Sequence, residues 1–354
     1  MKQYLFTPGP VPMSKEILKL GSEQVPYFRN TSFSKILIES KTLLLKLVNA
    51  KKGSDVIFLA SSGTGAMEAA TINLLNNRDK AIVINGGGFG QRFIDICSKH
   101  DVPNYEIKIK KNKKIDFSLL KELKANAFVV NAHETSIGKI YNLNKIGEFC
   151  KKNKLLNIVD AISAFVCEDI NMKKQNIDAL ILSSNKGLAL PPGLAMVVLS
   201  PNAIKKLKSI NVMYFDFKMY LANMVRGQTP FTPTVSIIKQ LHFRLNELNQ
   251  KSIKKSVQDT KQLAQYFRKK IKAFPLKPYL KNMPNGMTTL TPTDGRLANK
   301  IISDFEQQFN IILTPSGGGD KNKLIRISHM GYMTKEYIDV LIDSLKIYYN
   351  EEKK

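Results

Sequence analysis

Short apolar segments alternate with stretches of helical periodicity along most of this chain. The apolar segments have the length and the β-branched content of buried strands. They are Val56–Ala60, Ala81–Asn85, Ala127–Asn131, Leu156–Asp160, Ala179–Ser183 and Ala195–Leu199. Helical stretches lie between several of them, at Gly65–Asn76, Gln91–Lys99 and Leu143–Asn153. This alternation predicts an α/β fold in which helices cover a mainly parallel sheet.

A long amphipathic segment, Val235–Phe267, follows the predicted sheet and leads into a C-terminal part of mixed character. That part has apolar segments at Gly286–Leu290, Ile311–Leu313 and Leu324–Ser328, and helical segments near Leu297–Gln308 and from Thr334 onward. A chain of 354 residues exceeds what one hydrophobic core usually organises. We therefore expect an N-terminal arm over residues 1–20, a large domain over 21–250 and a small α+β domain over 251–354.

The composition indicates a soluble protein. Hydrophobic residues make up 43% of the chain, the mean hydropathy is −0.18, and no apolar run has membrane-spanning length. The N-terminus lacks the pattern of a signal peptide, which predicts a cytoplasmic location. Cys97, Cys150 and Cys167 are odd in number and show no CxxC spacing, so neither a disulfide framework nor a metal site is expected.

The net charge of +25 raises the question of a polyanionic partner. The basic residues are mostly lysines, whereas recognition of phosphates and bases usually relies on arginine. Runs such as Lys108–Lys114 and Lys269–Lys272 have the composition of solvated loops and helix faces. We therefore expect neither a nucleic acid nor a membrane as partner.

Lys186 follows the apolar segment Ala179–Ser183 and precedes the rigid turn Pro191–Gly193. Burial of an ammonium without a partner is unfavourable, so burial lowers the pKa of a lysine at a strand end. A neutral amine can form a Schiff base with an aldehyde, and pyridoxal phosphate is the commonest aldehyde cofactor. In a chain this rich in lysine, an ordinary surface lysine is the alternative.

Two glycine-containing segments follow predicted strands. Ser61–Glu68 opens a predicted helix, and free backbone amides at a helix start bind phosphate. A serine N-cap with purely structural glycines is the alternative. Gly86–Gly90 is a predicted loop that contains Phe89, whose ring either stacks on a flat heterocycle or packs in the core.

Asp160 ends the predicted strand Leu156–Asp160. A carboxylate at a buried strand end needs a cationic or hydrogen-donating partner, and the pyridinium nitrogen of a pyridoxal cofactor is one. A helix N-cap is the structural alternative. Because open α/β sheets bind their ligands at the carboxyl ends of strands, we expect Asp160 and Lys186 to face one pocket.

A series of motifs, in this order and spacing, resembles the class V pyridoxal-phosphate aminotransferases, above all the alanine–glyoxylate and serine–pyruvate or serine–glyoxylate branch. The motifs are Ser62–Ala69, Asn85–Gly86 with Phe89–Arg92, Glu134–Gly138, Val159–Ala161, and Ser184–Gly187 with Pro191–Gly193. The opening Thr7–Pro12 and the late Ile325–Gly331 also match, so the resemblance spans nearly the whole chain. It implies the aspartate-aminotransferase-like fold (fold type I), with a seven-stranded sheet in the large domain.

One position departs from the family pattern. Many relatives carry a histidine two places before the glutamate that Glu134 matches, whereas this chain has Ala132 there and His133 next to the glutamate. The local chemistry of the pocket is therefore expected to differ from that of these relatives.

The resemblance implies a role for each matching residue. Lys186 would bind pyridoxal phosphate as a Schiff base and move the proton of the substrate carbon, while Asp160 would pair with the pyridine nitrogen. Phe89 would stack on the ring, and Thr135 would contact the side of the phenolic oxygen. The implied phosphate neighbours within the chain are Ser62, Gly63, Thr64 and Ser184.

Further implied contacts concern the substrate and a second subunit. Arg326 would bind the substrate α-carboxylate with a bidentate fork. The N-terminal arm, with Pro8 and Gly9, would lie close to the substrate. Family members are homodimers with sites at the subunit interface, so Thr232 would reach the phosphate bound by the neighbouring chain.

Arg326 lies in an apolar segment after the glycine-rich turn Ser316–Gly319. An unpaired guanidinium is unfavourable there, and a substrate carboxylate would be a natural counter-ion; a structural carboxylate is the alternative. His133 and His329 either line the pocket or merely pack.

Together with these residues, the resemblance implies a pyridoxal-phosphate aminotransferase that moves an amino group from alanine or serine to glyoxylate or pyruvate in a ping-pong cycle. A 2-aminoethylphosphonate–pyruvate transaminase is an alternative and would need a cationic pocket. A cysteine desulfurase would need a cysteine on a mobile loop, whereas all three cysteines lie in predicted helix or strand contexts. A non-enzymatic basic scaffold is the third possibility, and an intact Lys186, Asp160 and phosphate cradle argue against it.

Overall fold

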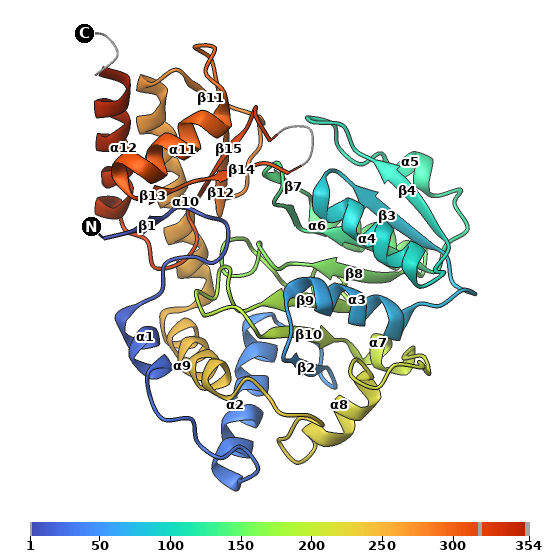
Figure 1. Cartoon of the computed structure of the whole chain (residues 1–354). Coiled ribbons are helices and arrows are strands. Elements are labelled where there is room, and N and C mark those ends of the chain that lie inside the picture. Colours follow the sequence, from blue (N-terminus) through green and yellow to red (C-terminus); the bar gives the residue numbers. More distant parts are fainter. Residues whose placement is uncertain (1, 318–320, 351–354) are drawn as a thin grey trace.

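A seven-stranded sheet forms the centre of the larger part of the computed structural model, which describes residues 2–317 and 321–350 (Figure 1). Its order is β2-β10-β9-β8-β5-β3-β4, and only β10 runs antiparallel to its neighbours. The strands are β2 (Asp55–Leu59), β3 (Ala81–Asn85), β4 (Asn104–Lys108), β5 (Ala127–Asn131), β8 (Leu156–Asp160), β9 (Ala179–Ser183) and β10 (Ala195–Leu199). The mainly parallel α/β sheet predicted from the sequence is confirmed.

The strand β4 has no counterpart among the predicted segments. It lies at the edge of the sheet, and its sequence Asn-Tyr-Glu-Ile-Lys mixes polar and apolar residues that are all at least partly exposed. A strand at the edge of a sheet is paired on one side only, so its residues can stay partly exposed and need not be apolar. A search for apolar runs therefore misses such a strand. The other strands coincide with predicted segments, and β2 begins one residue earlier than predicted.

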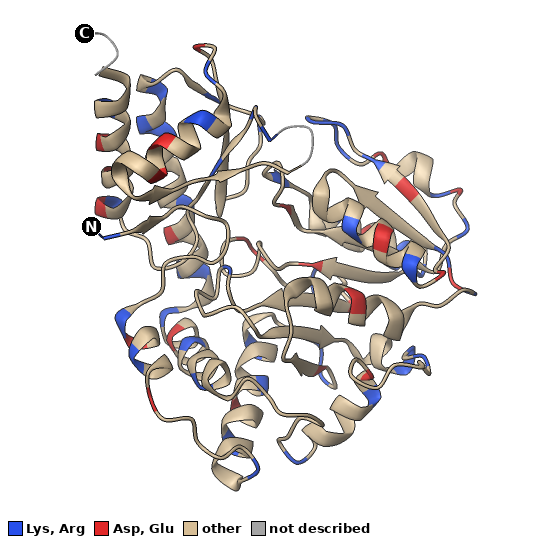
Figure 2. Ribbon diagram, viewed as in Figure 1, with Lys and Arg blue, Asp and Glu red and all other residues tan. Residues whose placement is uncertain are grey.

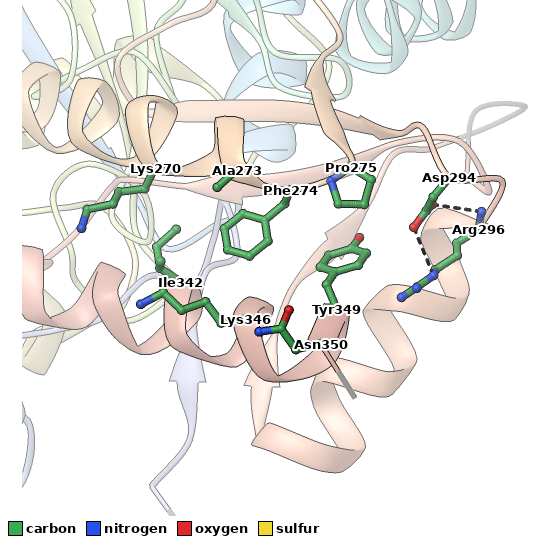
Figure 3. A pocket seen from close by; sticks show the side chains of 10 residues that line it. All are labelled: Lys270, Ala273, Phe274, Pro275, Asp294, Arg296, Ile342, Lys346, Tyr349 and Asn350. Atoms are coloured by element: carbon green, nitrogen blue, oxygen red, sulfur yellow. Dashed lines mark hydrogen bonds and ion pairs between the residues drawn. The ribbon is translucent and has the colours of Figure 1, made fainter. Parts of the chain in front are cut away.

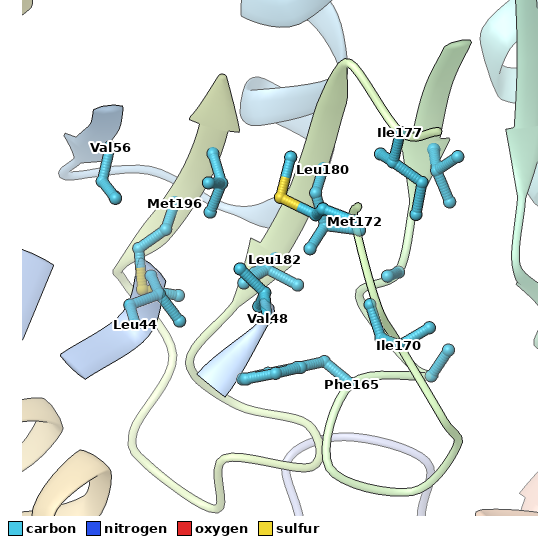
Figure 4. Close-up of a cluster of buried hydrophobic side chains, with 14 of the residues drawn as sticks. Leu44, Val48, Val56, Phe165, Ile170, Met172, Ile177, Leu180, Leu182 and Met196 are labelled. Atoms are coloured by element: carbon cyan, nitrogen blue, oxygen red, sulfur yellow. The ribbon is translucent and has the colours of Figure 1, made fainter. Parts of the chain in front are cut away.

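Helices cover both faces of this sheet. On one face α2 (Thr31–Leu47), α6 (Leu143–Lys152) and α9 (Val235–Lys251) contribute to a large hydrophobic cluster. Figure 4 shows part of it, where Leu44 and Val48 lie against Leu182 and Met196 of the sheet. On the other face α3 (Gly63–Leu74), α4 (Gly88–Lys99), α7 (Pro201–Lys205) and α8 (Phe217–Met224) form a second cluster. Strand residues alternate between the two clusters, as the pleat requires.

The smaller part contains a four-stranded sheet in the order β11-β12-β15-β14. Its strands and helices are β11 (Leu276–Pro278), β12 (Met287–Pro292), β14 (Thr314–Pro315), β15 (Ile325–Ser328), α10 (Ile253–Lys270), the 3-10 turn η1 (Ile271–Ala273), α11 (Ala298–Phe309) and α12 (Lys335–Asn350). A hydrophobic cluster separate from those of the large sheet fills its centre. Gly318 and Gly319 of the predicted glycine-rich turn lie outside the described residues.

The N-terminal segment joins the two parts. The strand β1 (Tyr4–Leu5) pairs in parallel with β13 (Ile311–Ile312), and α1 (Lys15–Gly21) packs on α9. The remaining elements are α5 (Phe117–Leu120) and the hairpin of β6 (His133–Glu134) and β7 (Lys139–Ile140).

The predicted helical segment Val235–Phe267 is divided in the structure. Ser252 has a φ of 72°, a left-handed conformation that ends α9 before α10 begins. This break supports our proposal that the large domain ends near residue 250, because α9 packs with the large sheet and α10 with the small one.

Lysines and arginines lie on helices and loops of both parts of the molecule, with acidic residues among them (Figure 2). Lys251 and Lys255, for example, both pair with Asp259 on α10. Exposed pairs of this kind contribute little to stability. Within residues 2–317 and 321–350, no helix combines the length and the apolar composition that crossing a membrane requires.

Candidate active site

The predicted site residues gather where several strands of the large sheet end. Asp160 is the last residue of β8, and Lys186 follows the last residue of β9. The helices α3 and α4 begin shortly after β2 and β3. Because these strands run in one direction, their carboxyl ends share one edge of the sheet, where α/β folds bind ligands.

Asp160 is held at this edge by neutral donors. Its Oδ2 accepts a hydrogen bond from Asn131 Nδ2 at 2.6 Å, and its Oδ1 accepts one from the Ile162 amide at 2.8 Å. Asn131 is its register partner on β5. Burial raises the pKa of Asp160 to about 6, although these two hydrogen bonds oppose the rise. A protonated ring nitrogen would supply the positive charge that these amides do not, so Asp160 fits the pyridine side of a pyridoxal cofactor.

Lys186 has an amine of lowered basicity. Burial lowers its pKa to about 8, and the nearby charges of Arg326 and Arg92 act in the same direction, while Asp160 opposes them. The arm residue Gly9 lies directly against it: a Cβ at Gly9 would approach Lys186 Nζ to 2.5 Å. This contact agrees with the prediction that the N-terminal arm lies close to Lys186.

We expect this lowered pKa to govern how fast the cofactor-free protein captures pyridoxal phosphate. Only the neutral amine attacks an aldehyde, so the capture rate should rise with pH up to about 8 and level off above it. A lysine at the ordinary value of 10.5 would keep accelerating well beyond that point. Stopped-flow absorbance measures the rate, with Nα-acetyl-lysine as the reference that cancels the ionisations of the aldehyde itself.

The start of α3 forms the predicted phosphate cradle. Ser62 is the N-cap, and its Oγ accepts from the Gly65 amide at 3.2 Å. The amides of Gly63 and Thr64 lie in the first turn of α3, where no carbonyl of the helix can accept a hydrogen bond from them. A Cβ at Gly63 would come within 2.6 Å of Ile162 Cδ1, so the backbone approaches its neighbours closely here. These features fit a phosphate group, although Ser62 also performs the capping role named as the structural alternative.

Ser184, a predicted neighbour of the phosphate, has hydrogen-bond partners within its own segment. Its Oγ donates to the Pro191 carbonyl at 2.5 Å and accepts from the Leu194 amide at 3.4 Å, so it serves the turn after Lys186. Ser183 lies beside the cradle, because a Cβ at Gly63 would be 3.4 Å from Ser183 Cβ. Successive side chains at a strand end point to opposite faces, so Ser183 is a further candidate for this contact and the role of Ser184 stays a prediction.

Phe89 lies on a helix rather than in the predicted loop, since α4 begins at Gly88. Its amide and that of Gly90 donate to the Glu134 carboxylate at 3.1 and 2.8 Å. Glu134 is fully buried, and its negative charge at the start of α4 is favourable for the helix dipole. The sequence motif contained Glu134, but the sequence alone assigned it no role, because its contact with α4 joins segments that are far apart in the chain.

Arg326 and Thr135 connect the two parts of the molecule. Arg326 Nη1 donates to the Thr135 carbonyl and Nε to the Pro315 carbonyl, both at 2.9 Å. Burial lowers the pKa of Arg326 to about 10, and Glu134 opposes this shift. Among the residues that the structure describes, no acidic side chain forms an ion pair with Arg326. The hydroxyl of Thr135 donates to Ser163 Oγ at 2.8 Å, beside the turn that follows Asp160.

The two candidate histidines have different surroundings. His133 is buried, its Nδ1 is 3.3 Å from the Ser163 carbonyl, and Nε2 has no partner among the described residues. Burial lowers its pKa to about 4, and the charge of Lys186 acts in the same direction. His329 Nε2 forms a hydrogen bond with Thr288 Oγ1, and its ring packs on Phe267 in the small domain. Only His133 therefore lies within electrostatic reach of Lys186.

Two further features are the predicted site residue Thr232 and a surface cavity. Thr232 is exposed, and the neighbouring Phe231 ring stacks on Tyr214 with centroids 5.1 Å apart. A cavity of about 470 Å³ on the small domain is lined by Phe274, Tyr349 and charged side chains, without any predicted site residue (Figure 3). No three His, Cys, Asp or Glu side chains within the described ranges are arranged to hold a metal ion.

Comparison with known proteins agrees with this fold. The family model described as Aminotransferase class-V matches residues 27–341. An uncharacterized aminotransferase of Helicobacter pylori is 32% identical, with 98% of this chain and 94% of the relative covered. An alanine–glyoxylate aminotransferase of Callithrix jacchus is 27% identical, with 97% and 86% covered. The crystal structure of an alanine–glyoxylate aminotransferase from Nostoc superposes with a TM-score of 0.91 at 21% identity, covering 98% of this chain and 94% of that one.

The chain belongs to the class V aminotransferases, because the family model covers most of its length. It is accordingly a transaminase whose cofactor is pyridoxal phosphate. The family resemblance noted in the sequence, the aspartate-aminotransferase-like fold and the cofactor are confirmed.

Proposed function

We propose that this enzyme transfers the amino group of a small amino acid, alanine or serine, to a small 2-oxo acid, glyoxylate or pyruvate. The observation that carries the proposal is the grouping of Lys186, Asp160 and Arg326: the charges of Asp160 and Arg326 both act on the buried amine. An amine, a carboxylate and a guanidinium within electrostatic reach of one another match the aldehyde, the ring nitrogen and the substrate carboxylate of transamination.

In this proposal each side chain has a defined task. Pyridoxal phosphate supplies an aldehyde for amines and a ring that takes up electrons from the substrate carbon. Lys186 Nζ accepts the proton from the substrate α-carbon and returns it at the next stage, which its pKa of about 8 suits near neutral pH. Asp160 keeps the ring nitrogen protonated, and Gly63 and Thr64 orient the phosphate. Arg326 orients the substrate by its carboxylate.

The arginines near Lys186 support the proposal of a small substrate with one carboxylate. Arg326 and Arg92 are the arginines whose charges act on it. Arg92 Nη1 already donates to Thr64 Oγ1 at 2.9 Å, on the side of the phosphate cradle. Because Arg92 lies on the side of the cradle, we assign Arg326 to the single carboxylate of a small substrate.

The experiment that tests the proposal is an absorption titration of the purified enzyme with pyridoxal phosphate. L-alanine, L-serine, L-aspartate and 2-aminoethylphosphonate are added one at a time. We expect alanine or serine to convert the aldehyde band to that of the pyridoxamine form, and glyoxylate or pyruvate to restore it. Conversion by aspartate alone, or by the phosphonate alone, would contradict the proposed donor class, and the latter would favour the phosphonate transaminase.

A cysteine desulfurase reaction finds no support in the cysteines. Cys97, Cys150 and Cys167 are all buried, and burial raises the pKa of each thiol, that of Cys97 to about 11. Thiols in this state are poor nucleophiles. Cys167 lies in a turn rather than in the predicted helix or strand context, but it is only 1% exposed.

We further propose that the enzyme is a homodimer in which Thr232 completes the phosphate site of the partner. Large apolar side chains are exposed near this loop, with Met213 68% and Val225 85% accessible. Such exposure is typical of surfaces that a partner covers. Arg29 holds the loop by donating to the Thr229 carbonyl at 2.7 Å and to Gln228 at 3.1 Å, so Thr232 is presented on a fixed segment.

Mixing two inactive or weakened variants tests this arrangement. Thr232→Val should weaken cofactor binding about tenfold, the effect of one hydrogen bond to a charged group, and Lys186→Ala should bind no cofactor covalently. In a mixed dimer, one site would combine an intact Lys186 with an intact Thr232. We therefore expect tight covalent binding to reappear in roughly a quarter of all sites after subunit exchange. If Thr232 served its own chain, mixing would restore nothing.

A further inference from the structure

Arg92 makes two contacts that join the aromatic residue of α4 to the phosphate cradle. Its guanidinium carbon lies 4.8 Å from the centroid of the Phe89 ring. Its Nη1 donates to Thr64 Oγ1 at 2.9 Å. Phe89 and Arg92 are three positions apart on one helix, a spacing that brings side chains onto the same face. A single planar group thus touches both the ring and the start of α3.

The guanidinium of Arg92 contacts a face of the Phe89 ring. Glu134 fixes the backbone at Phe89 and Gly90, but a backbone hydrogen bond does not restrain a side-chain rotamer. The ring is partly exposed, and it forms no aromatic pair with another ring of the described part of the chain. The planar guanidinium of Arg92 is the contact that covers one ring face.

We propose that Arg92 is a positioning residue that holds the Phe89 ring in the orientation required to stack on the cofactor. It does so by anchoring the ring to Thr64 of the phosphate cradle, so that the stacking platform and the cradle keep a constant spacing. This inference rests on the proposed function for the cofactor contact of Phe89, whereas the clamp itself is a property of the protein alone.

A second observation agrees with a role at the site. Arg92 forms no ion pair with an acidic side chain of the described ranges, although its guanidinium is partly buried. Its charge reaches Lys186 and lowers the pKa of that amine together with burial and Arg326. A purely structural arginine at this depth would be expected to have a carboxylate partner.

The absence of tryptophan from the sequence permits a direct test in the cofactor-free protein. Phe89→Trp introduces a single indole whose fluorescence anisotropy and acrylamide quenching report its mobility. Removing the clamp in Phe89→Trp/Arg92→Met should raise the quenching constant about twofold or more and lower the anisotropy, because the ring loses its cation–π partner. Equal quenching in the two proteins would overturn the inference.

Lys99→Met provides the matched control, since Lys99 is an exposed cation near the end of the same helix. In the Phe89→Trp background it should leave quenching and anisotropy unchanged. An increase equal to that of Arg92→Met would mean general loosening of α4 and would also overturn the inference. If Arg92→Met does not fold, Arg92→Lys replaces it, because lysine keeps the charge and lacks the planar fork.

A double-mutant cycle on cofactor binding tests the link to the proposed function. Arg92→Met alone should raise the dissociation constant of pyridoxal phosphate about tenfold, equivalent to ~1.4 kcal/mol. In a Phe89→Leu background the same change should have almost no further effect, because Arg92 acts through the ring. Additive effects would contradict this route. If no variant and no wild-type protein bound the cofactor, the proposed function would fail while the fluorescence result would still decide the clamp.

Discussion

Lys186→Ala is expected to retain pyridoxal phosphate without a covalent bond and to show no measurable transamination. In the role proposed for Lys186, the substitution removes the amine that attacks the aldehyde and the base that takes the substrate proton. Loss of a positioned general base alone lowers rates by roughly 10²- to 10⁴-fold. Asp160 and the cradle at Gly63 and Thr64 stay intact, so noncovalent binding should survive. Absorption spectra, borohydride trapping and steady-state turnover with alanine and glyoxylate measure these effects.

An exposed lysine serves as the control for this prediction. Lys205→Ala in the last turn of α7 removes an equal charge from the surface and should leave spectrum and turnover unchanged. The fold of Lys186→Ala is expected to be at least as stable as the wild type, since a buried amine with a lowered pKa is replaced by an apolar group. Measurable turnover in Lys186→Ala would refute the assignment of Lys186 as the catalytic amine.

Arg326→Ala is expected to raise the Michaelis constants for the amino acid and the 2-oxo acid together, with the absorption spectrum of the bound cofactor unchanged. Both substrates carry a carboxylate, and truncation of one partner in a buried, hydrogen-bonded charge pair costs about 2–5 kcal/mol, or roughly 30- to 4,000-fold. Steady-state kinetics with each substrate varied in turn measures the effect.

Two controls separate substrate binding from structure in this experiment. Arg326 also bonds the carbonyls of Thr135 and Pro315, so its removal should lower the free energy of unfolding by about 1–3 kcal/mol. Arg78→Ala removes an exposed arginine and should change neither kinetics nor stability. If Arg326→Ala altered only the spectrum, Arg326 would be a cofactor or structural residue instead.

The sequence predicted most of the large sheet because its central strands are buried on both faces. Such strands are continuous apolar runs, and β8 and β9 end at the residues where the pattern ended. The same reasoning placed Asp160 at the end of β8 and Lys186 three residues after the end of β9, since polar residues that close an apolar run lie near strand ends. The edge strand β4 shows the limit of the method, because one of its sides faces solvent and its residues need not be apolar.

Other features depended on contacts that no local pattern contains. The choice between Ser183 and Ser184 as neighbour of the cradle depends on which face of β9 meets α3. The start of α4 at Gly88 depends on Glu134, which is distant in the sequence but accepts the hydrogen bonds of that first turn. Ser252 divides α9 from α10 although its neighbours continue the helical periodicity.

The sequence by itself therefore determined the class of fold and the family, and it singled out Lys186 and Asp160 as candidates, because these follow from apolar periodicity and from motifs in a specific order. Only the tertiary structure decided the chemical environment of those groups. The pKa of Lys186 depends on burial and on Arg326 and Arg92, which come from other parts of the chain. Desolvation and charge act through space, so residues distant in the sequence set the basicity on which transamination depends.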